Sequence, residues 1–568
     1  MRRARRSSEK LGSEVASDEM GPLYERGLAK RDDDRRRGDG IFYTPADVAG
    51  FIVERTLRPL VADMSGDRLR QLRVLDPACG CGAFLLAAYR WLCDWHEAHS
   101  GGRRLSPAQR RVIARRHLAG IDIDPVAVQL ARQALALASG LPAAELADNI
   151  RVGDALLDHD GWFRGTFDAI VTNPPYVNIR RLAKSRGAAL AAAYRRRYRC
   201  AAGAFDLYTL FLERSVAALA ANGRMGAIVP NKLATLDYAR PCRELLLGEG
   251  TLDAIIDVSG LGIFADAEVY PYIVLWTKRR APRGHAIRVV RPATVSLTRC
   301  AGAGLSEGMT CRVLQSQQRA NRGLALGGDL DVESRVATVP LGEVCSIHSG
   351  ATGFQAAELA ARLVEAGSQS RSRRSTGLDF IVSGNIEPYA IELGDVRFMG
   401  RQFKRPVLAA DDPILTERKL RLYTDPKIVL AGMSRQLEAA LDTRGLALGV
   451  QVYALADWTV DPHYLLGLLN SRLMSRLFRL RFAAKRLAGG YYSLSKKQLA
   501  QLPMRILDLS DQSERRLHDQ LVDLVGRRLK EAGATSPAAL NLDALIDELV
   551  LALYRVAAVE VTRMPSAA

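Results

Sequence analysis

A short apolar strand that runs into a glycine-rich turn constrains the fold of this chain more than any other feature. Residues 72–76 read Leu-Arg-Val-Leu-Asp, and the turn that follows ends at Gly82, where a helix is predicted to begin. Gly80 and Gly82 permit a sharp turn and leave space for a ligand where a Cβ atom would otherwise stand. Such a turn at the carboxyl end of a parallel strand is typical of nucleotide-binding α/β folds. We therefore predict a cofactor loop here.

The residues present exclude two common loops of this kind. A dinucleotide fingerprint would have its third glycine at position 85, which is Leu85, and no Gly-Lys-Ser/Thr follows as in a phosphate loop. The next strand ends at Asp122, whose carboxylate is expected to accept both hydrogen bonds from a ribose diol. The 46 residues from Asp76 to Asp122 exceed the roughly 20 of the simple fingerprint, so an extra helix is predicted between them.

Apolar strands and amphipathic helices alternate along the first half of the chain. Strands are predicted at 118–123, 167–172, 225–229 and 272–276, and helices near 51–60, 126–138 and 206–219. This alternation predicts an α/β fold with a Rossmann-like, doubly wound parallel sheet.

The chain of 568 residues is too long for one ordinary core, so several domains are expected. We predict a basic, polar tail at 1–38, the α/β domain at 39–280, a connector at 281–335, a second mixed α/β domain at 336–510 and a helical segment at 511–568. The second domain has predicted strands at 379–382 and 427–431 and a helix at 464–480. A helix through 542–553 is predicted near the end of the chain.

The sequence Asn173-Pro174-Pro175-Tyr176 directly follows a predicted strand. Its two prolines hold an extended shape and remove two N–H groups, which leaves carbonyl oxygens and the Asn173 amide as acceptors. Acceptors in this arrangement suit an exocyclic amine, because hydrogen bonds from both its N–H groups favour a pyramidal nitrogen whose lone pair can point at an electrophile. Tyr176 can then stack on the base. A simple Asn-Pro turn is the alternative.

Two basic runs carry nearly all of the net charge of +18. Residues 180–199 and 472–497 each hold eight Lys or Arg residues and no acidic residue, with aromatic residues interleaved. Such runs favour nucleic acid as a partner, because cations release condensed counterions and aromatic rings stack on bases. A solvated helix face is the alternative for each run, and a membrane surface is less favoured for the second.

The remaining sequence features indicate a reduced, cytoplasmic protein that associates with the nucleoid through DNA. No apolar run approaches the length of a membrane span, no apolar signal region follows the first residues, and eight cysteines form no disulfide pattern. Cys93, His96 and His99 share a helix face and could hold a metal ion with a cysteine of the glycine-rich turn, but we expect no metal site, because buried cysteines are common.

Together these motifs resemble the gamma-class, Taq-type DNA adenine-N6 methyltransferases of restriction-modification or related defence systems, which use S-adenosylmethionine. The resemblance includes Phe42-Tyr43-Thr44-Pro45, Gly153-Asp154-Ala155-Leu156 and Gly262-Ile263-Phe264. It implies a catalytic loop of Asn173, Pro174, Pro175 and Tyr176, and stacking of the target base by Tyr176 and Phe264. The implied cofactor-binding residues are Tyr43, Thr44, Pro45, Asp76, Ala78, Gly80, Gly82, Asp122, Ile123, Asp154, Ala155 and Asn173.

The second domain resembles the target-recognition domain of the same enzymes. The matching segments are 349–353, 383–386, 425–428, 468–471 and 489–492, and residues 542–553 resemble a closing helix of longer relatives. The resemblance implies double-stranded DNA as partner, with a separately encoded endonuclease or defence proteins as further partners. Because only about 40 residues precede Phe42, fewer than the nuclease of restriction-modification fusions requires, we expect no cleavage within this chain. The candidate DNA-binding residues are Arg180, Arg181, Arg195, Arg196, Arg197, Arg479, Arg481, Lys485, Arg486, Lys496 and Lys497.

Two other functions remain open at this stage. The same loop could hold a planar amide or amidine of RNA or of a protein glutamine, and the chain could be a catalytically idle DNA-binding defence subunit. The long second domain and its basic run favour DNA over the first alternative. The set of Asp76, Asp122, Asp154, Asn173 and Tyr176 argues against an idle site.

Overall fold

The chain divides into two compact units, Met1–Gly328 and Asp329–Ala568, each with its own hydrophobic core. Of the predicted features, the tail at 1–38, Tyr43, Phe264, Lys485 and Arg486 lie outside the described residues. The computed structural model describes residues 44–62, 64, 66–157, 167–259, 261, 263, 270–292, 308–320, 324, 332–333, 335–351, 353–367, 377–482, 491–531 and 536–557.

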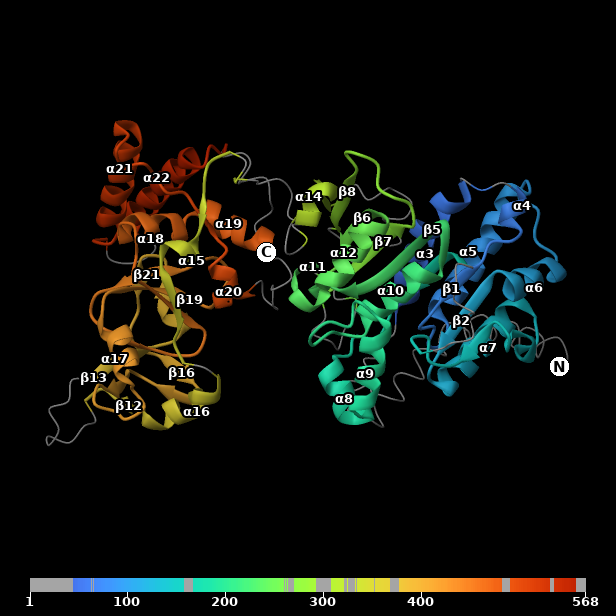
Figure 1. Ribbon diagram of the computed structural model, residues 1–568, viewed down its shortest axis with the longest axis horizontal. Coiled ribbons are helices and arrows are strands. Elements are labelled where there is room, and N and C mark those ends of the chain that lie inside the picture. The colour runs from blue at the N-terminus through green and yellow to red at the C-terminus, as the bar shows by residue number, and fades with distance from the viewer. Residues whose placement is uncertain are drawn as a thin grey trace, which may run out of the picture. The chain divides into compact units, whose positions relative to one another are not determined.

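The first unit is built on a nine-stranded sheet with the order β3-β2-β1-β4-β5-β7-β6-β8-β9 (Figure 1). Strands β3, β2, β1, β4 and β5 are parallel, whereas β7 is antiparallel to both of its neighbours, and β9 is antiparallel to β8. The strands are β1 (Val74–Asp76), β2 (Leu118–Asp122), β3 (Ile150–Val152), β4 (Phe167–Thr172), β5 (Leu219–Pro230), β6 (Thr251–Asp257), β7 (Pro271–Thr277), β8 (Ala286–Pro292) and β9 (Gly308–Leu314).

Helices cover both faces of this sheet, and a separate hydrophobic cluster fills each face. One cluster joins the sheet to α3, α5 and α7, and the other joins it to α9, α10 and α12. The helices are α3 (Ala46–Ala62), α4 (Gly66–Leu69), α5 (Ala83–His99), α6 (Pro107–Arg116), α7 (Pro125–Ser139), η1 (Ala143–Leu146), α8 (Ile179–Arg186), α9 (Ala188–Arg197), α10 (Tyr208–Ala218), α11 (Lys232–Thr235), η2 (Asp237–Ala239), α12 (Arg240–Glu249) and α14 (Gln315–Ala320).

The predicted α/β fold with a large central sheet is confirmed, and α6 is an extra helix between β1 and β2 as predicted. The sheet is mixed rather than wholly parallel, because β7 returns from β6 and enters between β5 and β6. All seven residues of β7 are buried, so its sequence is a continuous apolar run like that of a buried parallel strand. The stretch predicted as a connector, 281–335, contributes β8, β9 and α14 to this unit.

The second unit contains two four-stranded sheets, ordered β11-β23-β19-β21 and β12-β18-β13-β22, and several two-stranded ribbons. Its strands are β10 (Val339–Pro340), β11 (Ser346–Ser349), β12 (Val364–Glu365), β13 (Gly377–Ile381), β14 (Ile386–Glu387), β15 (Ala390–Ile391), β16 (Val396–Phe398), β17 (Arg401–Phe403), β18 (Pro406–Ala409), β19 (Lys427–Ala431), β20 (Met433–Ser434), β21 (Ala439–Asp442), β22 (Leu446–Leu448), β23 (Val452–Ala456), β24 (Tyr492–Ser493) and β25 (Pro503–Met504). Its helices are α15 (Leu341–Val344), α16 (Gly353–Arg362), η3 (Ser383–Asn385), α17 (Glu417–Thr424), α18 (Pro462–Asn470), α19 (Arg472–Arg481), α20 (Lys496–Leu499), α21 (Gln512–Arg528) and α22 (Pro537–Leu553).

The single helix predicted at 464–480 is two helices, α18 and α19, which meet at Ser471. Ser471 has an extended backbone, and its hydroxyl accepts a hydrogen bond from the Met474 N–H as an N-cap. The preceding Asn470 pairs with the β21 backbone, since its amide accepts from Ala439 N and donates to Ala439 O, both at 2.9 Å. The 468–471 segment therefore has a structural role in the second unit.

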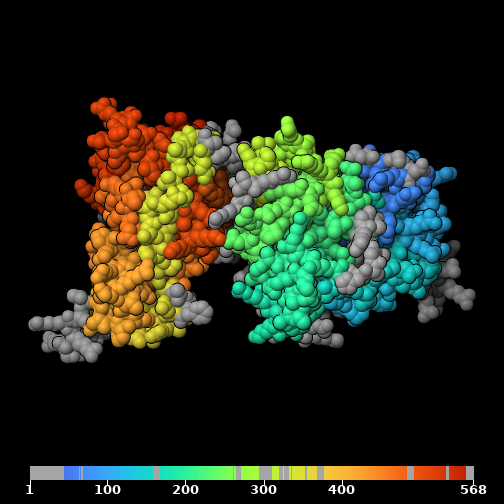
Figure 2. All heavy atoms as spheres, in the orientation of Figure 1, coloured from blue at the N-terminus to red at the C-terminus, as the bar shows by residue number. Residues whose placement is uncertain are grey.

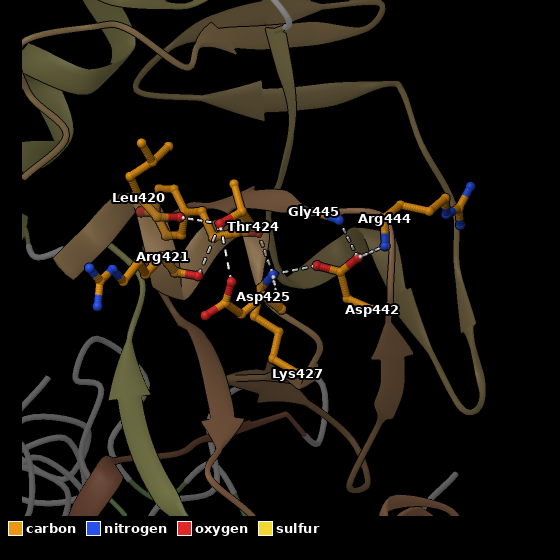
Figure 3. Close-up of polar contacts among 9 residues, drawn as sticks. Leu420, Arg421, Thr424, Asp425, Lys427, Asp442, Arg444 and Gly445 are labelled. Atoms are coloured by element: carbon orange, nitrogen blue, oxygen red, sulfur yellow. Dashed lines mark hydrogen bonds and ion pairs between the residues drawn. The ribbon is translucent and has the colours of Figure 1, made fainter. Parts of the chain in front are cut away.

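A buried ion pair joins α17, β19 and β21 (Figure 3). Lys427 Nζ lies 2.5 Å from Asp442 Oδ2 and donates to Tyr423 O at 2.7 Å, and neither charged side chain is more than 1% exposed. Asp442 Oδ1 accepts from the N–H groups of Arg444 and Gly445 at 2.9 and 3.1 Å. The pair therefore fixes the end of α17 and the turn after β21 in one arrangement.

Candidate functional site

The glycine-rich turn after β1 is held by the end of β2. Gly80 N donates to Asp122 Oδ2 and Asp124 N donates to Asp122 Oδ1, both at 2.9 Å. Gly82 has φ +89°, and a Cβ atom there would lie 3.0 Å from Ala131 Cβ, so the turn requires glycine. Asp122, predicted to hold a ribose diol, thus also fixes the loop, a role that sequence reasoning missed.

Three carboxylates lie at or just after the carboxyl ends of the adjacent strands β1, β2 and β3. Asp76 is buried, and its Oδ1 accepts from Ala78 N at 3.1 Å. Asp154 Oδ1 accepts from Leu156 N and Leu157 N at 2.9 and 3.2 Å. Backbone donors therefore orient each of these carboxylates before any ligand binds.

Burial perturbs two of these acids. Desolvation raises the pKa of Asp76 to about 7, against the lowering effects of the Ala78 N–H and the Thr172 hydroxyl. Desolvation also raises the pKa of Asp122, opposed by its hydrogen bonds from Asp124 and Gly80. A cationic ligand would favour the charged forms, so these acids suit a ligand that carries positive charge.

Two apolar side chains beside these acids are unusually exposed. Ile123, which follows Asp122, is 53% exposed, and Val152, which pairs with Asp122 across β2 and β3, is 51% exposed. An apolar surface next to oriented carboxylates suits a planar ring with polar edges. Val152 was not identified from the sequence as a candidate site residue. Its place at the end of a short strand is the signal that could have indicated this role.

The Asn-Pro-Pro-Tyr loop leaves the carboxyl end of β4 and contacts the segment before α3. Asn173 Nδ2 donates to Thr44 Oγ1 at 3.0 Å, and Thr44 is buried. This contact joins two predicted motifs that lie 129 residues apart in the sequence. It also fixes the plane of the Asn173 amide, with its nitrogen toward Thr44.

Both the hydroxyl and the ring of Tyr176 contact neighbouring residues. Its hydroxyl donates to Ile228 O in β5 at 3.0 Å, and its half-buried ring meets the ring of Tyr208 edge-on, with 6.4 Å between centroids. Burial raises the pKa of Tyr176 well above its ordinary value, so the hydroxyl stays protonated. Tyr176 is therefore suited to stacking rather than to proton transfer.

The first basic run forms α8 and α9, which pack against each other (Figure 1). Figure 2 shows the atoms of this helical pair, in turquoise, at the surface of the first unit. Arg197 is half-buried, and the exposed candidates are Arg180, Arg181, Arg195 and Arg196.

The interleaved aromatic residues of this run cannot stack on bases as expected. Tyr194 and Tyr198 are 4% and 6% exposed, and Tyr198 OH donates to Leu156 O at 2.6 Å. Both rings belong to the hydrophobic core of the first unit. Tyr194 lies on the buried face of α9, and Tyr198 follows the last residue of that helix.

The second basic run is partly neutralised by acids that lie far away in the sequence. Arg472 pairs with Asp547 at 3.1 Å, and Arg481 pairs with Glu333 at 2.5 Å. The predicted phosphate contact of Arg481 is therefore in competition with an ion pair, whereas Arg479, Lys496 and Lys497 are exposed.

The aromatic residues of the second run are also mostly buried. Phe478, Phe482 and Tyr492 are at most 8% exposed, but Tyr491 is 41% exposed, and Arg435 lies 5.1 Å from its ring centroid. Of this group, Tyr491 alone retains the exposure that a stacking contact needs.

Two further properties of the described residues concern metal binding and membrane insertion. These residues hold no group of three or more His, Cys, Asp or Glu side chains placed to bind a metal ion. None of their helices combines the length and apolar character that crossing a bilayer requires.

Two family matches cover separate parts of the chain. Residues 116–264 match the Eco57I restriction-modification methylase family, and residues 380–504 match the TaqI-like C-terminal specificity domain. The chain is 31% identical over 273 residues to the type II methyltransferase M.PaeR7I of Pseudomonas aeruginosa, with 47% of this chain and 44% of the relative covered. It is 26% identical over 335 residues to the adenine-specific methyltransferase PglX of Streptomyces coelicolor, with 50% and 26% covered. The chain thus spans less than half the length of either relative.

Solved structures extend the likeness in fold over most of the chain. The type IIL restriction-modification enzyme MmeI in complex with DNA has a TM-score of 0.59 at 15% identity, with 89% of this chain and 73% of that chain covered. The DrdV–DNA complex has a TM-score of 0.54 at 12% identity, with 89% and 59% covered.

Proposed function

We propose that this chain, in which a methylase region of the Eco57I family precedes a TaqI-like specificity domain, methylates N6 of an adenine in double-stranded DNA. It would act as the modification component of a restriction-modification or related defence system. The observation that carries the proposal is the hydrogen bond from Asn173 to Thr44, which brings the Asn-Pro-Pro-Tyr loop beside the segment assigned to the cofactor.

The residues at the ends of β1, β2 and β3 fit S-adenosylmethionine. Asp122 would accept hydrogen bonds from the ribose diol and Asp154 from the adenine edge, and Ile123 would pack on the adenine face. The glycine-rich loop with Asp76, Ala78, Gly80 and Gly82 would receive the methionine part, which carries positive charge, and Tyr43, Thr44 and Pro45 would close over it. When bound, S-adenosylmethionine supplies a methyl group on an electrophilic sulfonium.

The chain's own part in the reaction is to hold the amine. Asn173 and a carbonyl of the Pro174-Pro175 segment accept hydrogen bonds from the two N–H groups of a flipped adenine, whose lone pair then points toward the methyl group. Tyr176 stacks on the base, with Phe264 as a second stacking candidate. Transfer would be a direct in-line displacement, in which the amine nitrogen forms a bond to the methyl carbon as the bond from sulfur to that carbon breaks, and the nitrogen then releases a proton.

DNA contacts are proposed on the exposed cations of both units. In the first unit these are Arg180, Arg181, Arg195 and Arg196 with Arg197 beside them, and in the second Arg479, Lys496 and Lys497, whereas Lys485 and Arg486 stay predictions from sequence. Such contacts position the protein on the phosphates without reading sequence.

Expression of the chain in a methylation-free bacterial host, followed by single-molecule sequencing of the genome, tests the proposal. We expect N6-methyladenine in one short sequence motif, and no modification with the Asn173→Ala variant. Methylated RNA or protein glutamine in place of DNA would refute the proposed substrate. Binding of DNA without any methylation would instead identify an idle subunit.

A further inference from the structure

A connected network of side chains lies behind the Asn-Pro-Pro-Tyr loop and is not used by the chemistry above. At its centre is Asp206, which is 6% exposed and lies two residues before the first residue of α10. Asp206 Oδ1 accepts from Asn178 Nδ2 and Asp206 Oδ2 accepts from Tyr238 OH, each at 2.7 Å. Each carboxylate oxygen therefore has a donor, as a buried charge requires.

Backbone hydrogen bonds place this carboxylate against the exit of the loop. Ile179 N donates to Phe205 O and Leu207 N donates to Val177 O, both at 2.9 Å. Val177 and Ile179, the first and third residues after Tyr176, are thereby paired with the segment that carries Asp206. Asn178 also caps α8, because its Oδ1 accepts from Arg180 N at 3.0 Å.

The network reaches Tyr176 through two aromatic rings. Tyr238 OH lies 3.3 Å from the hydroxyl of Tyr208, which is fully buried, and the Tyr208 ring meets Tyr176 edge-on at an interplanar angle of 88°. Tyr238 belongs to η2, which follows β5, whereas Asn178 follows β4. Asp206 thus links the segments that follow the adjacent strands β4 and β5.

We infer that Asp206 is a positioning residue for the target base: acting through Asn178 and Tyr238, it holds the ring of Tyr176 at the angle needed to stack the flipped adenine. The inference rests on the proposed function. The hydrogen bonds of Asp206 run to Asn178 and Tyr238 and lead through Tyr208 to the Tyr176 ring, so we expect the network to act on the base rather than on the cofactor.

The test compares Tyr238→Phe, Asp206→Ala and the double variant with the wild-type chain. Ser215→Ala, which removes a buried hydroxyl from α10, the helix that begins two residues after Asp206, is the matched control. On a duplex that contains the sequence found to be methylated, we expect Tyr238→Phe to lower kcat about tenfold, equivalent to the loss of one charged hydrogen bond. S-adenosylmethionine affinity should stay within twofold. When 2-aminopurine replaces the target adenine, its fluorescence emission in the Tyr238→Phe complex should differ from that in the wild-type complex at the same fraction of bound duplex.

The double variant separates positioning from general destabilisation. If Asp206 acts through Tyr238, adding Tyr238→Phe to Asp206→Ala causes no further loss of kcat. Wild-type kcat in Tyr238→Phe, full additivity in the double variant, or equal losses of kcat and cofactor affinity would overturn the inference. A wild-type chain without DNA methylation would refute the proposed function and this inference with it, whereas an active wild type with unaffected variants refutes the inference alone.

Discussion

Replacing Asp76 by Asn should make the first unit more stable at neutral pH. The native pKa of Asp76 is about 7 because burial disfavours its charge, whereas an unfolded aspartate titrates near 3.8. Between these values the native state binds the proton that the unfolded state has lost, so the wild-type free energy of unfolding falls as pH rises. A difference of about 3 pKa units corresponds to roughly 4 kcal/mol at pH 7 and above.

The Asn side chain retains the shape of Asp76 without this cost, and its amide can donate to the nearby Thr172 hydroxyl. We expect Asp76→Asn to unfold at higher urea concentration than the wild type at pH 8, with a gain of up to about 4 kcal/mol that vanishes near pH 4. Four of the five tryptophans lie in the first unit, so tryptophan fluorescence reports mainly on its unfolding. The exposed Asp148 supplies a control, Asp148→Asn, which should change little.

The same substitution should weaken S-adenosylmethionine binding, because a neutral amide no longer attracts the cofactor's positive charge. Opposite effects on stability and on binding are typical of residues kept for function. Lower stability of Asp76→Asn at pH 8, or a stability difference that is the same at pH 5 and pH 8, would refute the argument.

Three other sets of substitutions test the contacts of Asp122, the Lys427–Asp442 pair and the cations of α8 and α9. Asp122→Ala should weaken S-adenosylmethionine binding at least about tenfold in calorimetry, because it removes charged hydrogen bonds to the ligand and also the acceptor of the Gly80 N–H. Unchanged affinity would mean that the end of β2 has another role. Lys427→Met should destabilise the second unit by about 3–5 kcal/mol in chemical denaturation, since it leaves Asp442 buried without a cation. The double variant Lys427→Met/Asp442→Asn should recover part of this loss. An unaltered denaturation midpoint in Lys427→Met would contradict the burial of the pair. Joint neutralisation of Arg180, Arg181 and Arg196 should lower the magnitude of the log K against log salt slope by up to about 0.9 per lost phosphate contact on all duplexes. As a control, Arg472→Gln should leave the slope unchanged, because Arg472 is paired with Asp547. An unchanged slope in the triple variant would show that α8 and α9 present a solvated face.

The sequence predicted those parts of the molecule that local patterns determine. The strand, turn and helix around Gly80 and Gly82 depend on residues close together, and so does the strand before Asn173. Burial by distant segments was not predictable: the Tyr194 and Tyr198 rings pack into a core that the basic run itself does not reveal. The acids that pair with Arg472 and Arg481 likewise come from other parts of the chain.

The sequence pattern also did not reveal the direction of β7 or the break between α18 and α19. An apolar strand buried on both faces has the same sequence pattern whether its neighbours are parallel or antiparallel, so the pattern predicts a parallel sheet and does not reveal that β7 is antiparallel. The break at Ser471 is set by a single capping hydroxyl inside an otherwise helical pattern. The second role of Asp122, holding Gly80, depends on β1 and β2 being neighbours in the sheet.

The position of β7 between β5 and β6 imposes an order on assembly during synthesis. The sheet neighbours of β6 are β7 and β8, and both are translated after it. Until β7 emerges from the ribosome, β6 is an apolar strand without a partner, beside an open β5 edge on which it could dock wrongly. If β6 docked on that edge, it would occupy the place of β7 and trap the nascent chain. This half of the sheet therefore assembles correctly when β6 and β7 first pair with each other and then add to β5 together.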